Sequence, residues 1–245
     1  MAGASAERQE NGVIQKIKEA VKKNKGHPIT LKAGKTTLEG VVGAEKYTGR
    51  QTGGSEPYTD VVIYVKKGAK IVEINCSLKG ESAPSLAGGG LKGLELAVPG
   101  IAKKFMLAAY KALKTEKKLK IGDKVPDVFG KISAANKVKI VVGNKAMGGP
   151  IDYMYIGPMT VTGTYDAKKN LLVLNGTLTD ATTYAKTHDL FFRLRARRED
   201  QKFDPDAKDK DGTPKIYGVS PSRGDSAGRI VVTDKVASTG VTVNI

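Results

Sequence analysis

The residues with the most distinctive chemistry lie between positions 57 and 81. Asp60 opens an apolar run that continues to residue 65, and a lysine-rich turn follows it. A second run, over residues 71–80, carries Ser77 and Lys79 near its end. A carboxylate at the start of one strand and a lysine on the next can hold a divalent metal ion beside a phosphodiester. These positions are therefore the first candidates for a functional site.

The second run predicts a strand with one polar and one apolar face, because side chains alternate across a strand. The polar face carries Glu73, Asn75, Ser77 and Lys79. The apolar face carries Ile74, Cys76 and Leu78, which we expect in the core. If the two runs pair as a hairpin, Asp60 lies close to the Ser77 and Lys79 end of the polar row.

The charge balance favours a polyanionic partner. The chain of 245 residues has 41 Lys and Arg against 25 Asp and Glu, a formal net charge of +16. Such a surplus is typical of proteins that bind DNA or another nucleic acid, because neutralised phosphates release counterions. The single cysteine excludes an internal disulfide, and with only two histidines it argues against a structural zinc site. We expect no membrane segment, because no apolar stretch approaches the ~20 residues of a span.

The periodicity of the chain predicts an α+β fold. Helical spacing of apolar residues predicts helices over residues 11–24 and 101–120, and the first ten residues read as a frayed terminus. Short strands are expected at 29–31 and 37–39, and residues 41–47 fit either a strand or a short helix. We expect a mixed sheet flanked by helices over 1–145 and a β-rich region over 146–245, either separate or continuous with the first sheet.

Further apolar runs between turn residues predict strands in the second half of the chain. These runs cover residues 138–142, 153–156, 159–165, 171–178, 190–195, 229–233 and 241–245.

The region around the hairpin resembles the PD-(D/E)xK nuclease superfamily. The resemblance rests on Pro57, Asp60 and Ser77-Leu78-Lys79 with the hairpin between them, and it covers roughly residues 40–110. Residues 75–80 also look like the equivalent segment of uncharacterised bacteriophage proteins. The resemblance implies a Mg²⁺-dependent or Mn²⁺-dependent DNA endonuclease encoded by a phage, located in the host cytoplasm or the virion. It also implies an α/β core in which acidic residues bind the metal beside the lysine.

The chain departs from the family pattern at one position. Ser77 stands where the resemblance implies a second carboxylate, and a hydroxyl brings no charge to a metal. Glu45 or Glu81 is expected to supply that charge together with Asp60. Lys79 would orient a water molecule or stabilise charge in the transition state, and Asn75 or Ser77 would fix a water through a hydrogen bond.

Two clusters of basic residues are candidate contacts to nucleic acid. They comprise Lys103, Lys104 and Lys111 on the second predicted helix, and Arg193, Arg195, Arg197 and Arg198. The alternative for the arginines is ion pairing with nearby acids such as Glu199 and Asp200. An alternative for the whole chain is a non-enzymatic nucleic-acid-binding or virion structural protein with a degraded nuclease-like site. A homo-oligomer or a virion assembly formed through exposed strand edges is a further expectation.

Overall fold

The computed structural model describes residues 2–50, 56–81, 90–194, 202–216 and 230–245. The chain divides into two compact units, each built from separated segments. Unit 1 comprises Met1–Arg50, Pro57–Pro84 and Val142–Tyr184, and unit 2 comprises Gln51–Glu56, Ser85–Val141 and Ala185–Ile245. One unit has an eight-stranded sheet and the other a four-stranded sheet, and both have helices, so the predicted α+β class is confirmed.

The sheet of unit 1 follows the order β7-β8-β1-β2-β3-β4-β6-β9. Its strands are β1 (Ile29–Ala33), β2 (Thr36–Lys46), β3 (Val61–Lys67), β4 (Lys70–Gly80), β6 (Tyr153–Gly157), β7 (Gly163–Asp166), β8 (Leu171–Leu174) and β9 (Thr177–Asp180). The pairs β1–β8 and β4–β6 are parallel, and every other neighbouring pair is antiparallel. The predicted hairpin is confirmed as β3–β4, and residues 41–46 belong to strand β2.

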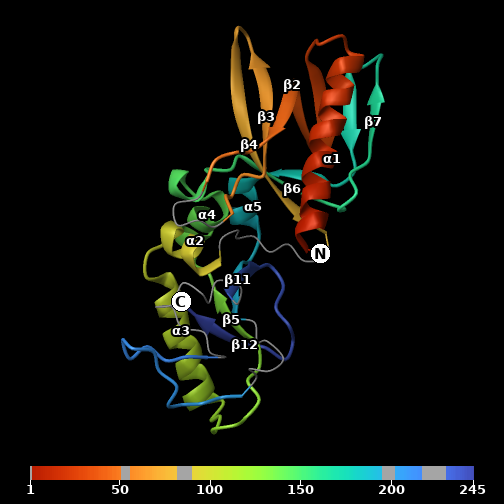
Figure 1. The fold of residues 1–245 in the computed structure, drawn as a ribbon. Helices are drawn as coiled ribbons and strands as arrows, with labels where there is room; N and C mark the ends of the chain where they lie inside the picture. The colour runs from red at the N-terminus through yellow and green to blue at the C-terminus, as the bar shows by residue number, and fades with distance from the viewer. Residues whose placement is uncertain (1, 51–55, 82–89, 195–201, 217–229) are drawn as a thin grey trace. The chain divides into compact units, whose positions relative to one another are not determined.

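Helix α1 (Ala2–Lys23) packs against β2 and β4 of this sheet (Figure 1). Its apolar stripe, including Val13, Ile17 and Ala20, is buried in the core together with Cys76 and Leu78 of β4. The helix predicted over residues 11–24 is therefore confirmed, but the prediction of a frayed terminus is wrong. Helical structure begins at Ala2, and the buried Gln9 anchors this segment to the sheet through hydrogen bonds to three backbone carbonyls.

The edge strand β9 of unit 1 contacts strands from the other half of the sheet. Strand β8 leads into β9 through only Asn175 and Gly176, and β9 also contacts β1 and β2. Tyr155 on β6 donates its hydroxyl hydrogen bond to the backbone carbonyl of Asn175, and the Asn175 Oδ1 atom accepts one from Thr162 N at 2.9 Å. These hydrogen bonds hold the β8–β9 turn against Tyr155 of β6 and against Thr162. They leave little space around the turn for an added side-chain atom.

The sheet of unit 2 follows the order β11-β10-β5-β12, with β5 (Val128–Lys131), β10 (Phe191–Leu194), β11 (Ile230–Thr233) and β12 (Val241–Asn244). Helices α2 (Gly90–Ala97) and α3 (Ile101–Lys111) belong to this unit, and α3 continues as a π-helix over Ala112–Glu116. Phe105 of α3 contacts Phe192 of β10 at a ring-centroid distance of 5.7 Å. Glu95 caps α3 by accepting hydrogen bonds from the backbone N–H groups of Gly100 and Ala102.

Several predicted elements differ from the structure. Residues 138–142, predicted as a strand, end helix α4 (Ala134–Val142), and the run 171–178 is broken at Gly176 into two strands. Strand β5 and helix α5 (Ala181–Thr187) were not predicted, and the 3-10 turn Lys145–Met147 follows α4. Strands β6 to β9 complete the first sheet, so the two units do not follow the predicted boundary at residue 145. Among the described residues, no helix combines the length and apolar character that a bilayer span requires.

Gly176 and Gly26 offer a matched test of the tight β8–β9 turn. Both have left-handed backbones, with φ of 86° and 80°, so alanine at either position costs about 1–2 kcal/mol. A Cβ at Gly176 would also lie 2.8 Å from the Ile156 carbonyl oxygen, whereas one at Gly26 would meet no atom within 4 Å. We expect Gly176→Ala to lower the free energy of unfolding by roughly 1–3 kcal/mol more than Gly26→Ala. Urea unfolding monitored by circular dichroism measures both, and equal losses would contradict the close approach.

Candidate functional site

The β3–β4 hairpin brings Asp60, Ser77 and Lys79 together in unit 1. Val61 is in register with Cys76, which places Asp60 beside the Ser77 end of β4. The Asp60 backbone is fixed on both sides, because its N–H donates to the Cys76 carbonyl at 3.0 Å and its carbonyl accepts from Tyr47 N at 3.0 Å. The acid therefore lies at the point where β2, β3 and β4 meet.

The two oxygens of the Asp60 carboxylate have different surroundings. Oδ2 accepts hydrogen bonds from the Leu78 backbone N–H at 2.6 Å and from the Ser77 hydroxyl at 3.0 Å. The Lys79 Nζ atom lies 3.9 Å from the same oxygen. No described residue donates a hydrogen bond to Oδ1, and the Asp60 side chain is 23% exposed. One oxygen is thus held by the protein, and the other is available to a ligand.

Ser77 orients the carboxylate. Its side chain is 3% exposed, and its hydroxyl donates to Asp60. Asn75, the other predicted water-fixing residue, donates its side-chain amide to the Pro150 carbonyl at 2.9 Å. Its backbone N–H donates to Asp152 at 2.7 Å. Asn75 therefore joins β4 to the segment that enters β6, and Ser77 acts on Asp60 itself.

The two predicted second acids, Glu45 and Glu81, each interact with a tyrosine. Glu45 of β2 is in register with Val62 of β3, and its carboxylate accepts a hydrogen bond from the Tyr64 hydroxyl at 3.4 Å. Glu81 lies two residues after Lys79, and its charge acts on Tyr155, whose pKa is raised to about 12 mainly by burial and also by Glu81. Within the described part of the chain, no group of three or more His, Cys, Asp or Glu side chains could hold a metal ion.

A carboxylate that sequence reasoning missed lies near the hairpin. Glu10 of α1 is 15% exposed and pairs with Lys46 of β2, with 2.9 Å between Oε2 and Nζ. Lys46 is in register with Val61, the residue next to Asp60. The hydrogen bond and charge of Glu10 raise the pKa of Lys46, and the charges of Glu7 and Asp60 raise it further. Glu10 was overlooked because its segment read as frayed, and only the tertiary fold brings α1 to this strand.

Gln9, the residue before Glu10, holds the backbone of Lys79 in place. Gln9 is 2% exposed, and its Nε2 atom donates to the Lys79 carbonyl at 3.2 Å. The same nitrogen donates to the carbonyls of Gly157 at 2.9 Å and Pro158 at 3.3 Å. An amide nitrogen has two hydrogens, so three acceptors share them. Helix α1 thereby holds the ends of β4 and β6 in place around Lys79.

The predicted nucleic-acid contacts lie in unit 2. Lys104 and Lys111 are exposed on α3, and Lys103 Nζ lies 3.9 Å from the Asp211 carboxylate. Arg193 donates from Nε at 3.1 Å and from Nη2 at 2.7 Å to Asp127 Oδ2, and it also lies over the Phe129 ring. Its guanidinium is therefore engaged within the unit, as the ion-pairing alternative predicted, although with a different acid. Arg195, Arg197 and Arg198 lie outside the described residues.

Cys76 is a free, buried thiol, as expected from its position on the apolar face. Its pKa is raised from an ordinary value of 9.0 to about 12, mainly by burial and also by the charge of Asp60. This side chain is therefore a core residue, and its thiolate does not form in the folded protein near neutral pH.

The raised pKa of Cys76 predicts a loss of stability at alkaline pH. The unfolded thiol ionises near pH 9 while the folded one does not, so the stability it provides is complete below that pH and falls as pH rises toward 12. The slope should approach about 1.4 kcal/mol per pH unit. Urea unfolding of the protein and of Cys76→Ala from pH 8 to 10.5 isolates this term, because other groups titrate alike in both. Parallel pH profiles would refute the buried-thiol assignment.

Comparisons of the chain with protein-family models, with curated proteins and with solved structures find no match. The functional argument therefore depends on the site's own geometry. That geometry consists of a carboxylate with one held and one available oxygen, a partly buried lysine 3.9 Å away, and a second carboxylate paired with the neighbouring strand.

Proposed function

We propose that the chain is a Mg²⁺-dependent or Mn²⁺-dependent DNA endonuclease, and that Asp60 and Lys79 of unit 1 are its reacting groups. The observation that carries the proposal is the difference in hydrogen bonding between the two oxygens of the Asp60 carboxylate. Oδ2 is locked by Leu78 N–H and Ser77, whereas Oδ1 accepts no hydrogen bond from a described residue. A carboxylate fixed in this way presents one oxygen in a constant direction, which a metal site requires.

The donor set suits Mg²⁺ better than a more demanding ion. Mg²⁺ keeps several waters and is commonly held by one or two carboxylates together with substrate phosphate oxygens. Asp60 would supply one carboxylate, and Glu10 joins Glu45 and Glu81 as a candidate for the second. The absence of a three-acid group among the described residues is consistent with such a sparse site. When bound, the ion would polarise the phosphoryl group and lower the pKa of a water molecule.

The remaining residues have separate tasks. The Lys79 ammonium group, 16% exposed on its side chain, is placed to stabilise negative charge that develops on the phosphoryl oxygens. Its electrostatic effect is strengthened because the group is largely removed from solvent. Ser77 and the Leu78 N–H keep the carboxylate from rotating, and Gln9 fixes the Lys79 backbone. The net charge of +16 favours association with a polyanionic substrate.

Two observations favour a second candidate, a non-enzymatic nucleic-acid-binding or virion structural protein. Ser77 replaces the acid that the resemblance implies, and its burial excludes it from ready access by solvent. Lys46 also draws Glu10 into an ion pair, which a metal would have to break. In this alternative, Asp60 and Lys79 stabilise the hairpin and have no substrate.

The first test is cleavage of supercoiled plasmid and of single-stranded DNA in Mg²⁺, Mn²⁺ or EDTA. We expect nicking that requires the metal and that falls at least about 100-fold in Asp60→Asn and in Lys79→Ala, as is usual on loss of electrostatic stabilisation. Asparagine retains an acceptor for the Leu78 N–H, so the fold should survive. Lys67→Ala, at the exposed tip of the same hairpin, is the control and should nick normally. Nicking in EDTA or in purified Asp60→Asn would sink the proposal, and salt-sensitive binding without any nicking would favour the second candidate.

The second test asks which acid assists Asp60. We expect Glu10→Gln to raise the Mg²⁺ concentration needed for half-maximal nicking by about 10-fold or more, because a charged ligand is lost. Glu45→Gln and Glu81→Gln remove the same charge from positions that contact Tyr64 or act on Tyr155, and they should leave that concentration within about 2-fold. If Glu45→Gln or Glu81→Gln raised this Mg²⁺ concentration more than Glu10→Gln, the second metal-binding carboxylate would be one of the two acids expected from the sequence.

A further inference from the structure

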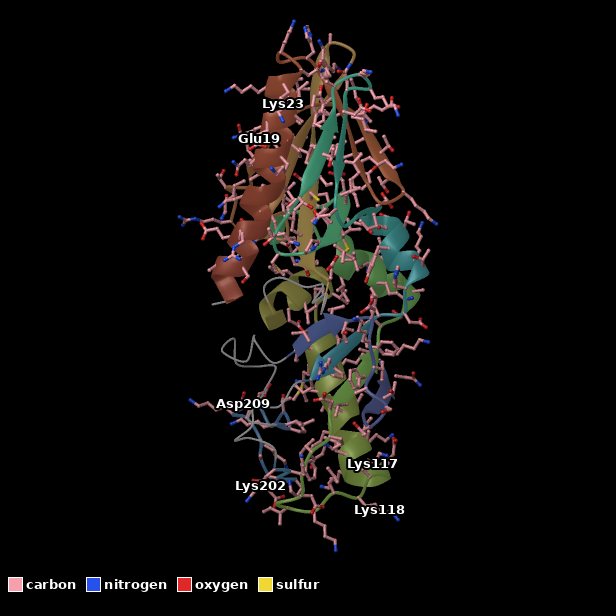
Figure 2. The ribbon with its side chains drawn as sticks, turned by 90° about the vertical axis from the view of Figure 1, so that its right-hand side faces the viewer. Glu19, Lys23, Lys117, Lys118, Lys202 and Asp209 are labelled. Carbon is pink, nitrogen blue, oxygen red and sulfur yellow. The ribbon has the colours of Figure 1, made fainter. Side chains whose placement is uncertain are left out.

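Unit 2 has a concentration of lysines where α3 and its π-helical extension end. We define the lysine end as Lys117, Lys118, Lys120, Lys124 and Lys202. The first four follow Ala112–Glu116 directly, and Lys124 forms an antiparallel bridge with Lys202. Lys117, Lys118 and Lys202 are labelled toward one end of this unit in Figure 2. Segments separated by almost eighty positions in the chain are thus brought together by backbone pairing.

The lysine end is poorly neutralised. All five side chains are exposed, and none forms an ion pair with a carboxylate in the described part of the chain. Two acids, Glu116 and Asp123, are adjacent in sequence to members of the lysine end, and Asp123 uses its Oδ2 atom to accept the Lys120 backbone N–H at 2.7 Å. Two lysines earlier on the same helix have partners, because Lys103 pairs with Asp211 and Lys114 lies 5.5 Å above the Tyr110 ring. The lysine end thus brings five exposed cations from two segments of the chain together without a carboxylate partner among the described residues.

A rigid base supports these side chains. The Gly122 N–H donates to the Phe203 carbonyl at 2.8 Å, and the Phe203 N–H donates to the Asp123 carbonyl at 2.7 Å. The Phe203 ring is 1% exposed and contacts Tyr110 at a centroid distance of 6.1 Å, while Leu113 is fully buried. A preformed backbone lowers the ordering cost of binding a ligand.

The turn after the π-helix presents Lys118 and Ile121 to solvent. Lys118 has a φ of 53°, the left-handed conformation in which helices commonly end, and Lys25 after α1 shares this feature. Ile121 is 70% exposed and lies between Lys120 and Lys124 in the sequence. An exposed apolar side chain among cations can contact a base or sugar while the lysines contact phosphate.

We propose that the lysine end binds the phosphate backbone of nucleic acid, with Ile121 contacting a sugar or a base. Lysines neutralise phosphates without reading sequence, and apolar side chains beside them pack against unstacked bases. An anionic membrane fits less well, because the buried residues of α3, including Phe105 and Met106, leave no apolar helix face for lipid. This inference does not require the proposed endonuclease activity. It assigns binding to a surface in the other unit from Asp60 and Lys79.

The test is the salt dependence of binding to a fluorescent duplex and to an oligothymidylate, both measured in EDTA so that no metal-dependent cleavage occurs. We expect the triple variant Lys117→Gln/Lys120→Gln/Lys124→Gln to bind about 10-fold or more weakly near 0.1 M salt. The slope of log K against log salt should fall by about 2–3, since each phosphate contact contributes about 0.9. Lys118→Gly should lower the slope by about 1 while keeping the melting temperature, because it removes the left-handed strain with the charge.

The matched control is Lys22→Gln/Lys23→Gln/Lys168→Gln, which removes the same charge from exposed positions in unit 1. We expect its affinity to stay within about 3-fold of the unmodified protein, since exposed charges that make no phosphate contact contribute little to binding. Ile121→Ser should weaken binding without changing the salt slope. Equal losses in the two triple variants would overturn the proposal. The proposal would also be overturned if the lysine-end variants lost binding to vesicles containing phosphatidylserine but kept their binding to DNA. Because nicking is measured separately with Asp60→Asn, failure of the endonuclease proposal would leave this result interpretable.

Discussion

The register of the β3–β4 hairpin determines the rest of the candidate site. Pairing Val61 with Cys76 directs Cys76 into the core and Ser77 toward Asp60. A shift by one residue would exchange the faces, so the thiol would replace the hydroxyl beside the carboxylate. Two interactions of Leu78 stabilise this register. Its side chain belongs to the core cluster, and its backbone N–H donates a hydrogen bond to Asp60. The same contacts that stabilise the sheet therefore orient the acid.

Helix α1 completes this arrangement from a distant part of the sequence. Its apolar stripe lies in the core, and the preceding turn brings Gln9 to the Lys79 carbonyl and Glu10 to Lys46. Burial of Gln9 is tolerated because its amide nitrogen reaches three backbone carbonyls, which leaves its donors satisfied. Burial of the helix and placement of the polar groups are thus coupled. A change that displaced α1 would alter both stability and the charges around Asp60.

The sequence was sufficient where the signal was local. Alternation over residues 71–80 identified the hairpin, the buried Cys76 and the juxtaposition of Asp60 with Lys79. It failed where nonlocal contacts decide the outcome. The apolar run at 138–142 resembles a strand, but it completes a helix whose first turn is set by Ser133, whose carbonyl accepts from Asn136 and Lys137. Strand β5 is only four residues long and contains Gly130, so its pairing with β10 and β12 left no periodic signal. Glu10 could not be identified because its proximity to Lys46 exists only after α1 docks on the sheet.

Two sets of lysines in this chain differ in their electrostatic surroundings. Lys46 and Lys79 face carboxylates at 2.9 and 3.9 Å, and Lys79 is largely shielded from solvent. Added salt weakens interactions between exposed charges, with a Debye length of about 8–10 Å near physiological conditions, but it affects shielded pairs much less. The lysine end has no such partners among the described residues, so its interactions with anions are open to screening. If unit 2 binds nucleic acid as we propose, raising the salt concentration should weaken that binding well before it disturbs the Asp60–Lys79 pair, because the two groups of lysines differ in solvent access and not in charge.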